Sequence, residues 1–410
     1  MFDARPQLVV GLEIGTSKVC AVVGERTTEG GLSIIGVGQA RSRGVRKGEI
    51  VDTTAAGEDV RTAIAEAEQM ADVEIRSVYL GVSGAHLQGF NNRGRHNIPS
   101  HDREIMDEDV QDVIKNAKAI NLPGDRHVVH VIRQHFIVDG QEGVIDPLGM
   151  PGAHLEVDVH VVHGITNRLQ TAIRVVKNLQ LEVENLVFNG IASALAVLTP
   201  QEKQRGALVL DLGAGCTEYV VYADGVIRHT GTPRRRRRPR HQRPRLRPQG
   251  RHGPRRSPET RARLRPRHPR PPGPHGAGPR RTGPPRTFTQ SRTPPPHHDR
   301  APRGDLRDHR RAARSRGPAR LPARRRGALW RGARVADIDR LAERVFSLPV
   351  ALGRTKTISG LVATLDQPEF ATGIGLVKFG SFQNAPLKGA RWASRLKATL
   401  GNLTTALRRS

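Results

Sequence analysis

Two stretches of the sequence share one design: GLEIGTSKVCAVVGE at residues 11–25 and LDLGAGCTEYVVYADG at residues 210–225. Each begins as an apolar strand with an acidic residue near its end, passes through a turn of small residues and returns as a second apolar strand. Glycine and other small residues let consecutive backbone N–H groups approach a phosphate closely. One such turn is common in β-hairpins, but two copies predict a cleft in which two related domains hold one phosphate chain.

The side chains of both copies suit a polyphosphate with its metal ion. The acids Glu13 and Asp211 would repel phosphate, but they can hold Mg²⁺ through water, as this ion prefers. Ser17 and Thr217 add hydroxyl donors, and Lys18 adds a positive charge. We therefore expect ATP and Mg²⁺ as ligands, with no residue predicted to ligate the metal directly.

The remaining candidates for chemistry are weak. Four histidines alternate along predicted strands without Cys, Asp or Glu at ligand spacing, so we interpret them as strand or surface residues and not as metal ligands; they are His127, His130, His135 and His160. No set of nucleophile, base and orienting group is evident. We expect no catalytic residue and at most a weak ATPase.

The positive charge is confined to one segment. The chain has 410 residues, enough for two or more domains, and a formal net charge of +28. Residues 232–331 contain 33 Arg, no Lys and four acidic residues, so the rest of the chain is nearly neutral. The segment has one Phe and one Trp, too few for interleaved base stacking, and we predict no nucleic-acid partner.

Composition also bears on location. The two cysteines, Cys20 and Cys216, lie far apart and form no metal or disulfide pattern. The N-terminus lacks the features of a signal peptide, and no run of 18 apolar residues occurs. These features predict a reduced, cytoplasmic environment.

Five stretches together resemble the FtsA family of bacterial cell-division proteins, within the actin, Hsp70 and sugar-kinase superfamily. They are the two hairpins, IIGVGQARSRGVRKGEIVD (34–52), SVYLGVSGAH (77–86) and LVFNGIASALAVLT (186–199). The resemblance covers residues 1–231 and about 332–410. It implies an α/β, actin-like (ribonuclease-H-like) duplicated ATPase fold with an inserted α+β subdomain and a disordered Arg/Pro-rich segment.

The resemblance also implies domain boundaries. Subdomain 1A covers 1–84 and continues at 163–200 and 368–381, and the FtsA-specific subdomain 1C (SHS2-like) is inserted at 85–162. Subdomain 2A covers 201–231 and 332–367, and 232–331 replaces subdomain 2B. Residues 387–410 form an amphipathic membrane-targeting helix.

By resemblance, residues 15–18 form the first phosphate loop and residues 211–217 the second. Gly332 and Ala333 are the remnant of an adenine-side motif that normally has more glycines. The predicted nucleotide-binding residues are Glu13, Gly15, Thr16, Ser17, Lys18, Asn189, Gly190, Asp211, Gly213, Gly215, Thr217, Gly332 and Ala333.

The C-terminal stretch 387–410 has the pattern of a helix lying in a membrane surface. Its large apolar residues recur at helical spacing on one face, while cations and no acids occupy the rest. A helix docked on the protein body is the alternative. The predicted membrane-binding residues are Trp392, Leu396, Leu400, Leu403, Leu407, Arg391, Arg395 and Lys397.

The resemblance implies an ATP-binding scaffold that anchors FtsZ filaments of the Z ring to the cytoplasmic face of the bacterial inner membrane. Further implied partners are anionic lipids, copies of itself in actin-like filaments, and later division proteins through residues 85–162. The alternatives are a pilus-assembly or cell-shape protein of the same fold, and a sugar-kinase-like enzyme.

Residues 232–331 read as a frame-shifted translation. They contain no Val, Ile, Met, Lys, Asn, Tyr or Cys, which is typical of GC-rich DNA read in the wrong frame. A natural disordered insert is the alternative. So little aliphatic content cannot offset chain entropy, and we predict disorder and loss of the FtsZ docking face.

Overall fold

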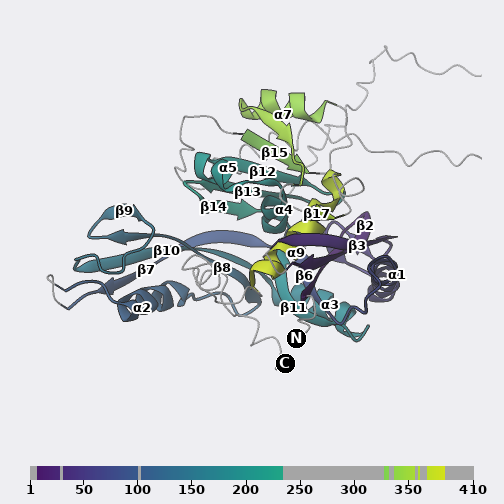
Figure 1. The fold of residues 1–410 in the computed structure, drawn as a ribbon, viewed down its shortest axis with the longest axis horizontal. Coiled ribbons are helices and arrows are strands. Elements are labelled where there is room, and N and C mark those ends of the chain that lie inside the picture. The colour runs from purple at the N-terminus through teal and green to yellow at the C-terminus, as the bar shows by residue number, and fades with distance from the viewer. Residues whose placement is uncertain are drawn as a thin grey trace, which may run out of the picture. The chain divides into compact units, whose positions relative to one another are not determined.

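The computed structural model describes residues 7–27, 31–99, 103–233, 327–331, 337–355, 359–360 and 367–383. The predicted membrane helix at 387–410, the residues Gly332 and Ala333, and most of the Arg/Pro-rich segment (234–326) lie outside these residues. Figure 1 shows the helices and strands with the labels used below.

The first half of the fold is built on one sheet. Its strand order is β11-β6-β1-β2-β3-β17. Strands β1, β2 and β3 form an antiparallel meander. Strand β6 pairs in parallel with β1, and β11 pairs in parallel with β6. Near-continuous burial of β1 and β2 follows from their position inside a sheet covered on both faces. The strands are β1 (Gln7–Ile14), β2 (Lys18–Arg26), β3 (Leu32–Arg41), β6 (Ser77–Val82), β11 (Glu182–Phe188) and the edge strand β17 (Ser359–Gly360).

The second half repeats this arrangement. A meander of β12, β13 and β14 is followed by β15 and β16 parallel to β12, in the order β16-β15-β12-β13-β14. The duplication seen in two hairpins therefore extends to whole sheets, which confirms the duplicated actin-like fold. The strands are β12 (Ala207–Leu212), β13 (Thr217–Ala223), β14 (Val226–Gly231), β15 (Gly327–Arg331) and β16 (Val350–Leu352).

Strand β15 corrects one boundary. The composition predicts that residues 327–331 belong to the disordered segment, but their backbone pairs in parallel with β12, from Ala207↔Gly327 to Asp211↔Arg331. The run Ala328-Leu329-Trp330 is short and flanked by arginines, so the composition of its surroundings hid it. The second half resumes at Gly327, not at Gly332.

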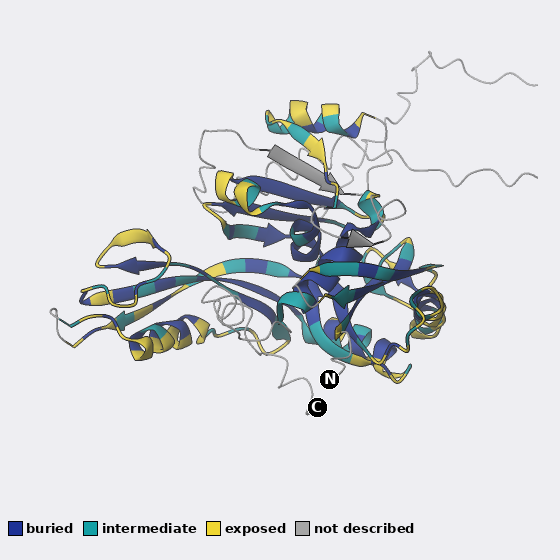
Figure 2. Cartoon of the chain, viewed as in Figure 1, coloured by how far each residue is buried: buried dark blue, intermediate teal, exposed yellow. Residues whose placement is uncertain are grey.

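Helix α1 (Thr53–Ala71) packs on the first sheet. The Asp52 side chain accepts hydrogen bonds from the N–H groups of Thr54 and Ala55, both at 3.0 Å, and so caps the helix. Small buried side chains such as Ala63 and Ala67 let it approach Gly36 and Gly38 of β3. Figure 2 shows its outer face exposed.

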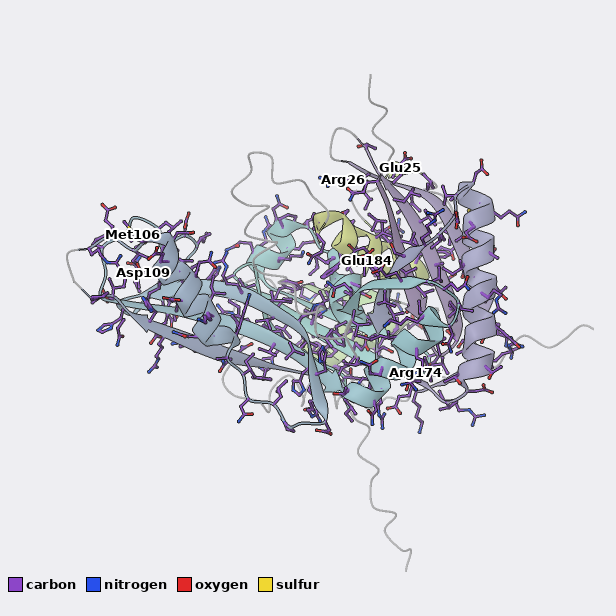
Figure 3. The ribbon with its side chains drawn as sticks, turned by 90° about the horizontal axis from the view of Figure 1, so that it is seen from below. Glu25, Arg26, Met106, Asp109, Arg174 and Glu184 are labelled. Carbon is purple, nitrogen blue, oxygen red and sulfur yellow. The ribbon has the colours of Figure 1, made fainter. Side chains whose placement is uncertain are left out.

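The insertion forms a sheet-and-helix unit with its own apolar core. At the start of its helix α2, Asp109 accepts a hydrogen bond from the backbone of Met106 at 2.8 Å (Figure 3). Its strand β7 meets β14 of the second half at Gln88↔Gly231, which joins the two into a sheet of nine strands among the described residues. The elements are β7 (Gln88–Asn97), α2 (Asp107–Lys118), β8 (Arg126–Val138), β9 (Gln141–Val144) and β10 (His154–Ile165).

Two helices cross where the halves meet. Helix α4 (Asn189–Val197) follows β11, and α9 (Ala371–Gln383) follows a turn of 3-10 helix, η1 (Pro368–Phe370). At the crossing, a Cβ on Gly375 would collide with the backbone of Ala192, so only glycine permits this approach. The remaining elements are β4 (Val45–Arg46), β5 (Glu49–Ile50), α3 (Thr166–Lys177), α5 (Pro200–Arg205) and α7 (Ile338–Phe346).

Candidate functional site

The turns of the two hairpins have matching geometry. Gly15 donates its N–H to the Lys18 carbonyl at 3.0 Å, and a Cβ on Gly15 would lie 2.8 Å from that oxygen. In the second hairpin, a Cβ on Gly213 would lie 2.9 Å from the carbonyl oxygen of Cys216. Both turns therefore need glycine at the same position for the same steric reason.

The two turns also meet in space. A Cβ on Gly215 would collide with Thr16 Oγ1, and it would lie 2.8 Å from Lys47 Cα. The missing side chain of Gly215 thus allows the second turn to rest against the first. The predicted residues Gly15, Thr16, Gly213 and Gly215 lie in these two apposed turns.

A third loop, which the sequence reasoning missed, completes this contact. It is the turn between β4 and β5, where Gly48 donates its N–H to Thr16 Oγ1 at 2.9 Å. Lys47 and Gly48 have φ angles of 54° and 74°, as in a type I′ turn. A Cβ on Gly48 would lie 2.8 Å from Ser83 Oγ and 2.9 Å from Cys216 Sγ. A two-residue turn ending in glycine within VRKGEI was the available signal.

The two acids occupy equivalent ladder positions but have different partners. Asp211 Oδ2 accepts hydrogen bonds from Ser193 Oγ of α4 at 2.7 Å and from Thr372 Oγ1 of α9 at 3.3 Å. Glu13 lies beside Gly81 in the first sheet, with its Oε1 3.7 Å from a Cβ placed on Gly15. Asp211 is therefore tied to the helix crossing, whereas Glu13 lies under the first turn.

Both acids act electrostatically on the Cys216 thiol. Burial raises its pKa, and the negative charges of Glu218, Asp211 and Glu13 raise it further, against a hydrogen bond with Ser83. Glu218 was not predicted; it is buried and accepts the Gly84 N–H at 3.3 Å. Among the residues that the structure describes, no cluster of three or more His, Cys, Asp or Glu has metal-binding geometry.

Asn189 supplies a buried acceptor near Glu13. Its side-chain oxygen has no hydrogen-bond partner among the described residues, and a Cβ on Gly81 would touch that oxygen. A buried polar atom without a protein partner is unusual and suits a water or ligand donor. Two carboxylates and this amide oxygen fit a hydrated Mg²⁺, which prefers oxygen ligands. The neighbouring Gly190 instead packs against Phe188, 2.8 Å from a Cβ placed on it.

Lys18 is directed elsewhere. Its ammonium donates to Gln39 Oε1 at 3.0 Å, lies 3.8 Å from Glu369 Oε1 and sits 4.3 Å from the centre of the Phe370 ring. These contacts hold it between β3 and the start of α9. Of the remaining predicted residues, Ser17 is exposed in the first turn, and Thr217 begins β13 opposite Leu212.

Two of the four histidines are buried. The Phe188 N–H donates to His130 Nε2 at 3.0 Å, and His160 contacts Thr230 Oγ1 at 2.8 Å and Asn91 Oδ1 at 2.6 Å. Burial lowers the pKa of His130 to about 4 and that of His160 to about 3. They connect the insertion to the first and the second half, respectively.

Comparison with known proteins agrees with this architecture. Residues 84–163 match the family model for the SHS2 domain inserted in FtsA. Over 224 residues the chain is 40% identical to the cell division protein FtsA of Pseudomonas aeruginosa and to that of Escherichia coli K12, covering 55% of this chain and 53% of each relative. The FtsA of Borreliella burgdorferi is 41% identical over 224 residues, 55% of this chain and 54% of the relative. The chain spans about half the length of the curated relatives it matches.

A solved PilM–PilN type IV pilus biogenesis complex shares the fold, with a TM-score of 0.52 and 14% identity over 91% of this chain and 98% of that chain. The fold and the facing hairpins therefore define an actin-like fold with an SHS2 insertion. Over the matched residues the sequence is FtsA-like, in agreement with the resemblance predicted from sequence. No helix among the described residues has the length and hydropathy needed to span a bilayer.

Proposed function

We propose that the chain binds Mg²⁺·ATP between residues 15–17 and 213–217 and acts as a scaffold that attaches FtsZ filaments to the cytoplasmic face of the membrane. The packing of Gly215 on Thr16 carries this proposal, because it brings two phosphate-type turns from different halves to one place. A ligand that touches both turns would stabilise their apposition. ATP would therefore act as a structural switch for filament formation.

Different groups at the site would bind the phosphates and the metal. Backbone N–H groups of small-residue turns are suited to phosphate oxygens where no carbonyl of the turn accepts them. Glu13, Asp211 and Asn189 would hold the metal through its water shell. Bound magnesium would neutralise phosphate charge. No side chain here is assigned as a general base, so hydrolysis would be slow.

The test is Gly213→Val in the full chain, with a fluorescent ATP analogue as the ligand. The new side chain would displace the Cys216 carbonyl and spoil the turn, so we expect binding to be lost. Gly57→Ala is the control, because a Cβ there has nothing within 4 Å. Unchanged affinity in the Gly213 variant would refute the site.

We propose that residues 387–410, outside the described residues, anchor the chain to anionic membranes. Each basic residue near such a surface contributes about 1 kcal/mol, and each buried Leu or Trp roughly 1.5–3 kcal/mol. Trp392→Glu should sharply reduce sedimentation with acidic liposomes. A chain shortened to Gln383 that sediments equally well would contradict the anchor.

We further propose that most of the Arg/Pro-rich segment is a frame-shifted remnant of the region that docks FtsZ, so that attachment of FtsZ belongs to the protein with the frame restored and is lost in the chain with this segment. Its composition, not its structure, supports this, since residues 234–326 lie outside the described part. Self-association and recruitment of later division proteins through residues 85–162 would remain available. In the gene, one of the other two reading frames across this segment should encode a sequence rich in aliphatic residues. Stop codons in both of those frames would refute the frameshift.

A further inference from the structure

We propose that Lys47, not Lys18, is the lysine that binds the phosphate chain. This inference rests on the proposed nucleotide site and names a binding residue within it. Lys47 lies at the tip of the β4–β5 turn, with its Cα 2.8 Å from a Cβ placed on Gly215. Its backbone is thus in contact with the seam where the two phosphate turns meet.

The turn is firmly fixed on both sides of Lys47. Gly48 donates to Thr16 Oγ1 at 2.9 Å, and Val45 is buried. Glu49 forms an ion pair with Arg168 of α3. A lysine at the tip of an anchored turn starts from a defined place, so little ordering is needed for it to reach a nearby anion.

The charge of Lys47 is available. Its side chain is exposed, and no carboxylate of the described residues forms an ion pair with its ammonium. Lys18 differs, because its ammonium already contacts Gln39, Glu369 and the Phe370 ring. Moving Lys18 to a ligand would break these contacts, whereas Lys47 has none of this kind to lose.

The backbone of Lys47 carries a further indication. Its φ of 54° lies in the left-handed region, where asparagine and glycine are favoured and lysine is strained. Strain at a single position is often retained where a side chain has a function. A structural turn alone would be better served by asparagine, so the choice of lysine here is consistent with a role for its ammonium.

The experiment measures binding of Mg²⁺·ATP and Mg²⁺·tripolyphosphate to the full chain by calorimetry. Tripolyphosphate lacks adenine, so it reports on the phosphate turns alone. Lys47→Met should weaken both ligands about tenfold, as expected for one charged hydrogen bond. Lys18→Met and the neighbouring Arg46→Met should change affinity less than threefold, and Lys47→Arg should retain most of it.

Lys47→Asn separates binding from folding. It should keep or raise the melting temperature, because asparagine tolerates the backbone, while it weakens the ligand as Lys47→Met does. Unchanged affinity in both Lys47 variants, with binding still lost in Gly213→Val, would overturn this inference alone. If the unmodified chain binds neither ligand, the proposed nucleotide site fails and the inference fails with it.

Discussion

The two halves of the molecule have the same strand order, but different contacts hold the hairpin of each half in place. In the first half, the phosphate-type turn is held by the β4–β5 turn through Thr16 and Gly48. In the second, Asp211 is held by hydroxyls from the crossing helices, Ser193 and Thr372. Duplication has thus preserved the backbone scaffold, whereas the side chains that connect it have diverged.

The helix crossing should give the largest effect when changed. Gly375→Val places a side chain against the backbone of Ala192, and neither helix can yield without disturbing both halves. We expect destabilisation by at least about 3 kcal/mol, measured by urea unfolding. Gly57→Ala, in an open part of α1, should stabilise by about 0.5–1 kcal/mol. Equal stabilities for the two variants would contradict a tight crossing.

Acid should weaken both connections of the insertion. His130 and His160 have folded pKa values of about 4 and about 3, against 6.5 when unfolded. Below pH 6.5 the unfolded chain therefore takes up protons that the folded chain does not, and stability falls as pH falls. Near pH 5.5 each histidine should lower the free energy of unfolding by about 1 kcal/mol relative to neutral pH.

Urea unfolding at pH 7.5 and pH 5.5 measures this loss. His130→Gln tests the connection to the first half and His160→Gln the connection to the second. Each variant should reduce the difference between the free energies of unfolding measured at the two pH values. A difference that neither substitution changes would show that other groups are responsible.

The paired turn glycines test whether the halves are equivalent at the site. A Cβ on Gly15 or on Gly213 would come within 2.8 or 2.9 Å of a carbonyl oxygen across its own turn. Gly15→Ala and Gly213→Ala should therefore cost similar free energies of unfolding, about 1–2 kcal/mol each. Unequal costs, by more than about 1 kcal/mol, would break the equivalence.

We expect the smallest effects when either of the two connecting hydrogen bonds, Ser193–Asp211 or Gly48–Thr16, is removed. Ser193→Ala removes a donor from the buried carboxylate of Asp211, while Thr16→Val removes the acceptor for the Gly48 N–H. Both should destabilise by about 1 kcal/mol, and Ser193→Ala by more, because its bond involves a charge. Chemical denaturation of both variants at one pH measures the ranking; the reverse order would mean that Thr16 is the stronger connection.

The hairpins were predictable because each depends on residues close in sequence, and the insertion because the stretches around it resemble a known family. Turns of small residues between two apolar runs are local signals. The acids Glu13 and Asp211 could be found because the duplication placed them at matching positions.

What escaped prediction depends on contacts across long sequence distances. Lys18 reads as a phosphate ligand until Gln39 and Glu369 are placed beside it. Strand β15 is recognisable only through its pairing with β12. The Lys47–Gly48 turn matters because Gly215, far along the chain, packs on it.

The two cysteines give the molecule a pair of chemical reporters. Cys20 lies fully buried in β2, while Cys216 lies in the second turn with its thiol kept protonated by burial and nearby acids. Thiolates, not thiols, react with maleimides and disulfides, so neither residue should react readily in the native state. Separation of the turns would free Cys216 while Cys20 stays protected until the sheet itself unfolds. The ratio of their alkylation rates would therefore distinguish local separation of the two turns from loss of the whole fold.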